Sequence, residues 1–458
     1  MAGRRVVVVG GGASGGLLVA QLLRRGAAGL EIQVLEPRPE PGLGAAFSTR
    51  DPWHRLNVAA ITMSALPDDP DHFRRWAGAA PEAFLPRMTW GRYLREILVE
   101  SEAGSAARLV HRRERATGLA GDAAAPAVTT AAGEVIVADA VVIATGNDLP
   151  AVPSFFEAFR VDPRFVADPW APASLDPVAD GETVAIIGTG LTAVDLAATL
   201  VRSRPACHVV MLSRRGDLPR AHEDPWRPRP PEPAFTVDEL RAAADPFAFA
   251  RERITGHPGG WRQGLDSLRP IHVPIWLAMD DGQRRRFVDE WRHTWEIHRS
   301  RVAAEVLRDV EGWIAGGRLV VRAAPVGSVV ADGARLRVEA VAGESAAGES
   351  AAGKSAAGGA VLADHVLLAT GPDERPAANP FLAAAIAAGV LREGPVGLGI
   401  DVDPGTLRVR DAHGATDRPI WALGPVLKGA LWETTAIPEI RAQAAQVAAA
   451  VLEGLGAA

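Results

Sequence analysis

The sequence predicts an α/β protein built from two similar units, each with a parallel sheet, together with a helical insert. Two repeated features carry this prediction. An apolar strand, a glycine-rich turn and an apolar-periodic helix follow one another at residues 4–26 and again at 183–200. A strand that ends in Ala-Thr-Gly comes after each of them, at 138–146 and at 363–371. This order predicts two units, the second inserted into the first.

Length and composition fit a large globular protein of several domains. The chain has 458 residues, of which 48% are apolar and 23% charged. A net charge of −6 gives no reason to expect nucleic acid or an anionic membrane as a partner. We expect a cytoplasmic location, because no signal peptide is recognisable and no apolar run approaches the roughly 20 residues that span a bilayer. Cys207 is the only cysteine, which excludes a dithiol redox relay, and no metal site is expected.

The first unit opens with a buried run of valines and then Gly10-Gly11-Gly12-Ala13-Ser14-Gly15, which fits the G-x-G-x-x-G pattern. Glycines in this pattern permit a tight turn, and the following helix N-terminus binds a pyrophosphate. The next strand ends at Glu36, where an acid hydrogen-bonds ribose hydroxyls. We therefore expect a dinucleotide to be held here by Gly10, Gly12, Ala13, Ser14, Gly15 and Glu36.

The second unit has the same turn with a different chemistry after it. Its next strand ends in Ser213-Arg214-Arg215 in place of an acid. An acid would repel a 2′-phosphate, whereas a hydroxyl and two guanidiniums would bind it; the alternative is a solvated arginine pair at a strand end. We expect NADPH, held by Gly188, Gly190, Leu191, Thr192, Ser213, Arg214 and Arg215. Because hydride from a nicotinamide needs an acceptor, FAD is the expected dinucleotide of the first unit.

These elements predict two Rossmann-like domains. The FAD-binding domain is expected to be discontinuous, at residues 1–165 and 364–458, and the NADPH-binding domain to span 166–363. A helical insert rich in proline, tryptophan and arginine is expected at about 224–310.

The insert contains a predicted long helix at 280–302. One apolar stripe along this helix is either core packing or the aromatic wall of a ligand pocket, and it comprises Phe287, Trp291, Trp295, His298 and Val302. Further on, residues 343–359 repeat a five-residue unit of small polar residues, which predicts a surface loop.

Three further stretches carry a family resemblance. They are GLGAAFSTRDPWHRLNVAAITMS at 42–64, LSRRGDLPRAH at 212–222 and GPVLKGALWETTAIPEIRAQA at 424–444. With the two glycine turns, they resemble the FAD/NAD(P)-binding flavoproteins that include flavin-dependent urate hydroxylase and the aspartate N-hydroxylase that forms nitrosuccinate. The resemblance covers nearly the whole chain, including RRRF and WEIHRSR in the insert.

The resemblance implies positions around the flavin. Gly10, Gly12, Ser14 and Glu36 would hold the ADP part of FAD. His54, Asn57, Val58 and Met63 would lie near the flavin ring or pyrophosphate, and Gly424, Trp432 and Thr434 would reach its other side. Helix geometry agrees, since the N-terminus of the last helix could face the electron-rich edge of the ring. Asn57 as a turn residue and Trp432 as simple packing remain alternatives.

The function implied is that of a single-component monooxygenase. NADPH would reduce the flavin, and one atom of O2 would pass to a small polar substrate, with His54 and Asn57 as the candidate catalytic residues. An anionic substrate is suggested by Arg284, Arg299 and Arg301, whose alternative is a solvated helix face.

N-hydroxylation of an aspartate-like amino acid is the first expectation, and hydroxylation of urate or another heterocycle the second. A flavin reductase without oxygen insertion and a non-catalytic dinucleotide sensor are the remaining alternatives. The fingerprint of the Baeyer-Villiger enzymes is not found between the two glycine turns, which disfavours oxygen insertion into ketones.

Overall fold

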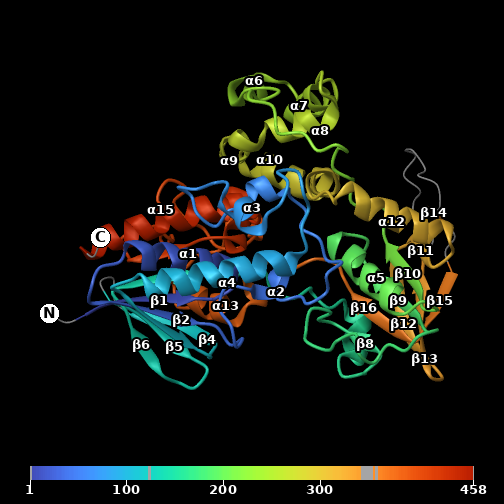
Figure 1. Ribbon diagram of the computed structural model, residues 1–458, viewed down its shortest axis with the longest axis horizontal. Helices are drawn as coiled ribbons and strands as arrows, with labels where there is room; N and C mark the ends of the chain where they lie inside the picture. Colours follow the sequence, from blue (N-terminus) through green and yellow to red (C-terminus); the bar gives the residue numbers. More distant parts are fainter. Residues whose placement is uncertain (1–2, 122–124, 342–353, 356–358, 457–458) are drawn as a thin grey trace.

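The computed structural model describes residues 3–121, 125–341, 354–355 and 359–456. The surface loop expected at 343–359 lies outside these residues, apart from 354–355 and 359. Figure 1 shows the first domain on the left, the second on the right and the helical insert above them. Within the described residues, no helix has the length and apolar character needed to cross a membrane.

The first domain is built on a five-stranded parallel sheet. Its strand order is β17 (Ile420–Ala422), β7 (Ala140–Ile143), β1 (Arg4–Val9), β2 (Leu30–Leu35) and β3 (Arg108–Arg112). The inner strands β1 and β7 are apolar and buried, as expected where both faces of the sheet are covered, whereas the edge strand β3 is more polar. Helices α1 (Ala13–Arg25), α4 (Arg87–Ala103) and α15 (Ile437–Leu455) cover one face (Figure 1). The other face carries α13 (Pro380–Ala387) and a small antiparallel sheet of β4 (Ala116–Gly121), β5 (Pro126–Thr130) and β6 (Val135–Val137).

The second domain repeats this plan on a six-stranded parallel sheet. Its order is β14 (Lys354–Ser355), β11 (Leu319–Ala323), β10 (His208–Ser213), β9 (Thr183–Ile187), β16 (His365–Leu368) and β8 (Phe165–Val166). Helices α5 (Leu191–Ser203) and α12 (Ala304–Ala315) pack on one face. On the other face lies an antiparallel sheet of β12 (Val326–Asp332), β13 (Arg335–Ala340) and β15 (Gly359–Ala363).

The fold class predicted from the sequence is confirmed, with both glycine turns placed between a strand and a helix. By strand pairing, β16 lies in the second sheet, so the chain returns to the first domain a few residues after the expected boundary at 363–364. The Ala-Thr-Gly strands β7 and β16 each lie next to the strand that precedes a glycine turn.

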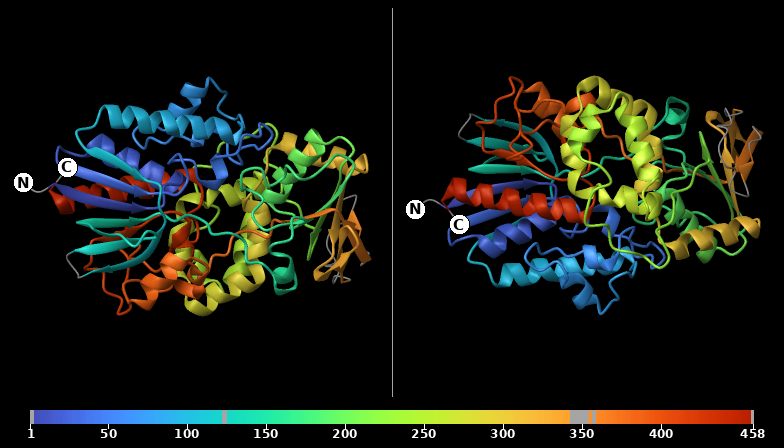
Figure 2. Two further views of the ribbon diagram at one scale, coloured as in Figure 1. Left: turned by 90° about the horizontal axis from the view of Figure 1, so that it is seen from below. Right: turned by 90° about the horizontal axis from the view of Figure 1, so that it is seen from above.

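The insert is helical and lies across the junction of the two domains (Figure 2). Its helices are α6 (Val237–Ala242), α7 (Pro246–Thr255), α8 (Gly260–Ser267), α9 (His272–Ala278), α10 (Asp281–Arg286) and α11 (Arg292–Arg299), with a π-helical turn η4 (Phe287–Trp291) between the last two. The long helix expected at 280–302 is therefore present in three parts. A π turn adds a residue to the helical repeat and re-aims the side chains that follow it.

Shorter elements complete the chain. They are α2 (Gly44–Phe47), η1 (Ala60–Thr62), α3 (His72–Ala77), η2 (Ser154–Phe159), η3 (Arg269–Ile271), η5 (Pro376–Ala378), η6 (Pro395–Gly397), η7 (Pro425–Leu427) and α14 (Lys428–Leu431).

Candidate functional site

The first glycine turn is shaped so that only glycine fits at two of its positions. Gly10 has φ of +99°, and a Cβ there would lie 2.4 Å from the carbonyl oxygen of Ala144 at the end of β7. A Cβ on Gly15 would lie 2.1 Å from the carbonyl oxygen of Gly10. Gly12 caps α1 without any side-chain hydrogen bond, so the first backbone N–H groups of the helix lack a side-chain acceptor. Such a helix start is suited to an anion.

Glu36 lies beside this turn, at the end of β2, and is buried. One carboxylate oxygen accepts the backbone N–H of Gly11 at 3.0 Å, and the other accepts that of Arg38 at 3.0 Å. The acid is thus fixed next to the phosphate-binding turn, at the position where a ribose would follow a pyrophosphate.

The C-terminal segment reaches the same turn. Gly424 has φ of +81°, and a Cβ there would lie 2.4 Å from Oγ of Ser14. Gln443 of α15 accepts the N–H of Gly424 at 2.8 Å and donates to Oγ1 of Thr434 at 2.9 Å. Thr434 in turn donates to the carbonyl oxygen of Gly424 at 2.8 Å. This closed ring of hydrogen bonds holds residues 424–434 against the first turn.

Trp432 and Glu433 point from this segment into the insert. Trp432 has φ of +60°, and its ring stacks on Trp276 at 5.0 Å between centroids. Glu433 is buried; it accepts the indole N–H of Trp295 at 3.0 Å and pairs with Arg299 at 3.2 Å. Burial by itself would raise the pKa of Glu433, but the cations around it, led by Arg299, lower it to about 2. The turn therefore joins the insert to the first domain through a charged pair.

The segment at 54–63 belongs to the first domain. It packs against the hydrophobic core of that domain and also contacts the second domain. Met63 is fully buried, and Val58 packs against the same core. The carbonyl oxygen of Asn57 accepts Nε2 of His222, from the second domain, at 2.9 Å. Because His222 is buried, its pKa is lowered to about 4, so the ring is neutral.

His54 also faces the second domain. Its Nδ1 lies 2.8 Å from Oγ1 of Thr49, and its Nε2 lies 2.8 Å from Oγ1 of Thr199 on α5. With both ring nitrogens engaged and only 5% of the residue exposed, the geometry does not favour His54 as a base for a substrate.

The second glycine turn repeats the first. Gly188 has φ of +125°, and a Cβ there would lie 2.2 Å from the carbonyl oxygen of Ala369. Gly190 caps α5 with open space where a side chain would be, and Leu191 and Thr192 begin the helix. The backbone of this turn can therefore approach a ligand closely.

The strand end after this turn differs as expected from that of the first domain. Oγ of Ser213 accepts the N–H of Gly216 at 2.9 Å and lies 3.0 Å from Oγ1 of Thr189. Arg214 and Arg215 are exposed, and neither has an ion-pair partner among the described residues. Two uncompensated cations at this position fit a bound phosphate.

Each of the three arginines expected to bind substrate is paired with an acid of the protein. Arg301 is buried and pairs with Asp266, while Arg299 is held by Glu433, so neither lies on a solvated helix face. Arg284 donates to the carbonyl oxygen of Trp276 at 3.3 Å and pairs with Asp281 at 3.2 Å.

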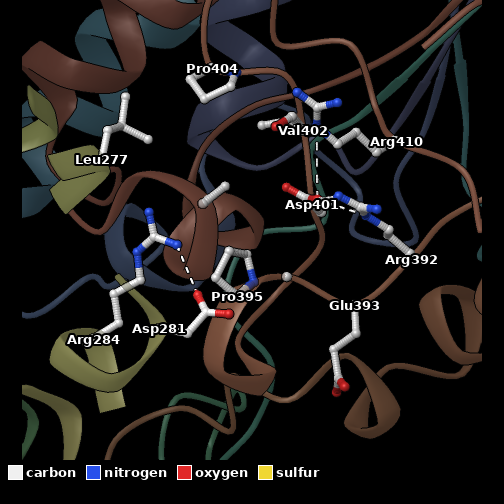
Figure 3. Close-up of a pocket in the computed structure, with 12 residues that line it drawn as sticks. Leu277, Asp281, Arg284, Arg392, Glu393, Pro395, Asp401, Val402, Pro404 and Arg410 are labelled. Carbon is white, nitrogen blue, oxygen red and sulfur yellow. Dashed lines mark hydrogen bonds and ion pairs between the residues drawn. The ribbon is translucent and has the colours of Figure 1, made fainter. Parts of the chain in front are cut away.

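Arg284 lines an open pocket of about 530 Å³ (Figure 3). Asp401 lies between Arg392 and Arg410 on the opposite side of this pocket (Figure 3). Most of the charged side chains that line this pocket are thus paired with other side chains of the protein.

Sequence reasoning did not indicate the buried polar residues Asp195 and Gln443, and it placed Glu433 only in the turn near the flavin, without its ion pair. Each is buried. Asp195 and Gln443 sit on otherwise apolar helix faces, and that break in the apolar pattern is the signal that could have indicated them. No comparable pattern marks Glu433, whose partners are far away in the sequence.

Comparison with known proteins agrees with this geometry. Residues 7–148 match the family described as FAD-NAD(P)-binding. No curated protein sequence is significantly similar to the chain.

Solved structures resemble the whole chain. Ornithine hydroxylase from Pseudomonas aeruginosa is 17% identical over 99% of each chain, with a TM-score of 0.63. The ornithine N-hydroxylase of Kutzneria sp. 744 is 18% identical over 98% of this chain and 99% of its own, with a TM-score of 0.64. L-lysine 6-monooxygenase from Pseudomonas syringae is 16% identical over 98% and 99%, with a TM-score of 0.65.

At these identities the likeness establishes the fold. The narrower resemblance read from the sequence, to urate and aspartate hydroxylases, differs from these neighbours in the substrates they are named for. The family match and the solved structures together support a broader statement than that resemblance. Residues 7–148 match an FAD-NAD(P)-binding family, and the whole chain shares the fold of these solved structures.

Proposed function

We propose that the protein is a single-component monooxygenase that uses FAD and NADPH to hydroxylate a nitrogen atom of a small anionic amino acid. An aspartate-like amino acid is the substrate that we propose first. The observation that supports it most is the contrast between the two glycine turns. One is followed by a buried acid, Glu36, and the other by two exposed arginines, Arg214 and Arg215. An enzyme with this pair of sites takes hydride from one dinucleotide and delivers it to another.

The residues around the first turn fit FAD. The start of α1 and Glu36 would hold its pyrophosphate and ribose, and Gly424 and Thr434 would approach from the other side of the turn. When bound, FAD would supply the site that accepts hydride and reacts with O2.

The protein's own part is to orient the reactants and exclude water. The Glu433–Arg299 pair connects the insert to the turn at 432–434. In the same place, the rings of Trp276 and Phe287 pack against the ring of Trp432. A cover of this kind limits the access of water to the reacting atoms. Arg299, which pairs with Glu433 of this turn, is the residue that we propose first for a substrate carboxylate.

Hydroxylation of a planar heterocycle such as urate is the second candidate. The observation that favours it is the same aromatic cluster, since ring faces suit a planar substrate. The solved neighbours named for ornithine and lysine support the N-hydroxylation of an amino acid instead.

The test is to purify the protein with FAD and to follow NADPH oxidation, H2O2 release and product mass with aspartate, ornithine, lysine and urate. The proposal expects bound FAD and a product one oxygen atom heavier with one amino acid. Steady NADPH oxidation with an artificial acceptor, but no oxygenated product from any substrate, would support a reductase. Failure to bind FAD would remove the proposal altogether.

A further inference from the structure

One face of α5 carries polar side chains that contact the first domain. Asp195, Thr199 and Arg202 follow one another at helical spacing. All three meet the first domain: Asp195 contacts Arg87, Thr199 contacts His54, and the Arg202 guanidinium lies 3.8 Å from the centre of the Trp53 ring. The start of the same helix is the second glycine turn, so this face links the proposed NADPH site to the first domain.

The contacts of Thr199 form a complete chain of hydrogen bonds. Its hydroxyl donates to the carboxylate of Asp51, so it must accept the hydrogen of Nε2 of His54. Nδ1 of His54 lies 2.8 Å from the hydroxyl oxygen of Thr49, and that oxygen accepts the N–H of Asp51 at 3.2 Å. Each side-chain group in this chain of contacts has a partner, which fixes the orientation of α5 as well as its distance from the first domain.

A second contact lies one helical turn nearer the glycine turn. Asp195 is buried and pairs with Arg87 at 2.8 Å. Arg87 also donates through Nε to the carbonyl oxygen of Arg55 at 3.1 Å, and its backbone N–H donates to that of His54 at 2.8 Å. Arg87 therefore connects α5 to the same segment that holds Thr199.

Arg87 is the first residue of α4, which packs along α1. Leu94 of α4 is fully buried, and one of its methyl groups lies 3.2 Å from the place that a Cβ on Gly16 would occupy. The two helices that begin at the glycine turns, α1 and α5, are thus connected through α4. Helix α5 contacts His54 and Arg87, the first residue of α4, and α4 packs on α1.

We propose that an interdomain cluster, made of Asp51, His54, Arg87, Asp195 and Thr199, positions the NADPH site against the FAD site and so sets the rate of hydride transfer. These are positioning residues, since none lies at either glycine turn. The inference rests on the proposed use of both dinucleotides. Hydride passes directly from donor to acceptor, so a small displacement of α5 lowers the rate without changing how tightly NADPH binds.

The experiment compares Thr199→Val with Thr199→Ser in the FAD-bound protein, mixed with NADPH without oxygen while the flavin absorbance is followed. Valine keeps the shape but removes the hydroxyl, whereas serine keeps the hydroxyl. We expect Thr199→Val to lower the limiting rate of flavin reduction about tenfold or more and to leave the Kd of NADPH within about twofold. Thr199→Ser should restore the rate. Thr255→Val, at an exposed end of α7 where the hydroxyl bonds its own helix, is the matched control.

The outcomes separate this inference from the proposed function. If NADPH does not reduce the flavin of the unaltered protein, both are overturned. If it does, and Thr199→Val reduces equally fast, or slows only through weaker NADPH binding, or is not rescued by serine, the cluster has no positioning role. Should Thr199→Val fail to retain FAD, Asp51→Asn carries the same test, because it weakens the acceptor of the Thr199 hydroxyl and keeps its shape.

Discussion

At the scale of single residues, the clearest assignments are those where backbone geometry leaves no choice. Gly10 and Gly188 have positive φ and a carbonyl oxygen where a side chain would be. Such positions could be predicted from the sequence, because the glycine pattern follows a strand and precedes a helix in each case. The contacts of His54 could not, since they depend on how two domains meet.

Arg214→Ala tests the proposed cofactor preference. Loss of one charged hydrogen-bonding group should weaken NADPH by about 1.5–3 kcal/mol, or on the order of ten- to a hundredfold, with little effect on NADH, which has no 2′-phosphate. Affinities of both cofactors, measured by titration, check this. Arg25→Ala, an exposed arginine at the far end of α1, should change neither. Equal weakening of NADPH and NADH by Arg214→Ala would contradict the assignment.

At the scale of elements, regular strands and helices follow from the apolar pattern, whereas the joins between elements do not. The sequence predicts one helix at 280–302, and a continuous helical run is present at 281–299 with a π turn at Phe287–Trp291 inside it. This turn changes which side chains face the first domain. Phe287 contacts Trp432 and Trp295 donates to Glu433, so these two residues of the stripe pack against the segment at 424–434 that reaches the first glycine turn.

Glu433→Gln tests the join between α11 and this turn. The change keeps the shape but removes the carboxylate paired with the buried guanidinium of Arg299, and Glu439 and Asp266 compensate it only in part, so that the cost is up to about 3–5 kcal/mol. We expect a lower unfolding temperature and weaker retention of FAD, measured by thermal unfolding and by dialysis. Glu296→Gln, whose partner Arg292 lies on the same helix and is partly exposed, should cost less than about 1 kcal/mol. Similar effects of the two changes would show that the pair does not hold the insert.

At the scale of the whole molecule, buried histidines make the free energy of unfolding depend on pH. Burial lowers the pKa of His222 and of His272 to about 4, below the ordinary value of 6.5. Between these values the unfolded chain binds protons that the folded chain does not. Stability from these groups is therefore fully present above about pH 6.5 and is lost as the pH falls toward 4, by up to about 3 kcal/mol for each histidine.

Denaturant unfolding measured from pH 4 to 8 checks this expectation. His222→Gln can still donate to the carbonyl of Asn57 and should flatten the curve, because glutamine takes up no proton. His413→Gln, at an exposed position, should leave it unchanged. A stability that is constant between pH 6.5 and 4 in the unaltered protein would contradict the burial of the two rings.

The proposed activity requires that an oxygen atom from O2 reach a substrate. The most direct test is to supply isotopically labelled O2 to the FAD-bound protein with NADPH and an amino acid, and to determine the mass of the product by mass spectrometry. The proposed function predicts one labelled oxygen atom in each product molecule. Complete recovery of the label as H2O2, with every amino acid and urate unchanged while NADPH is consumed, would contradict it.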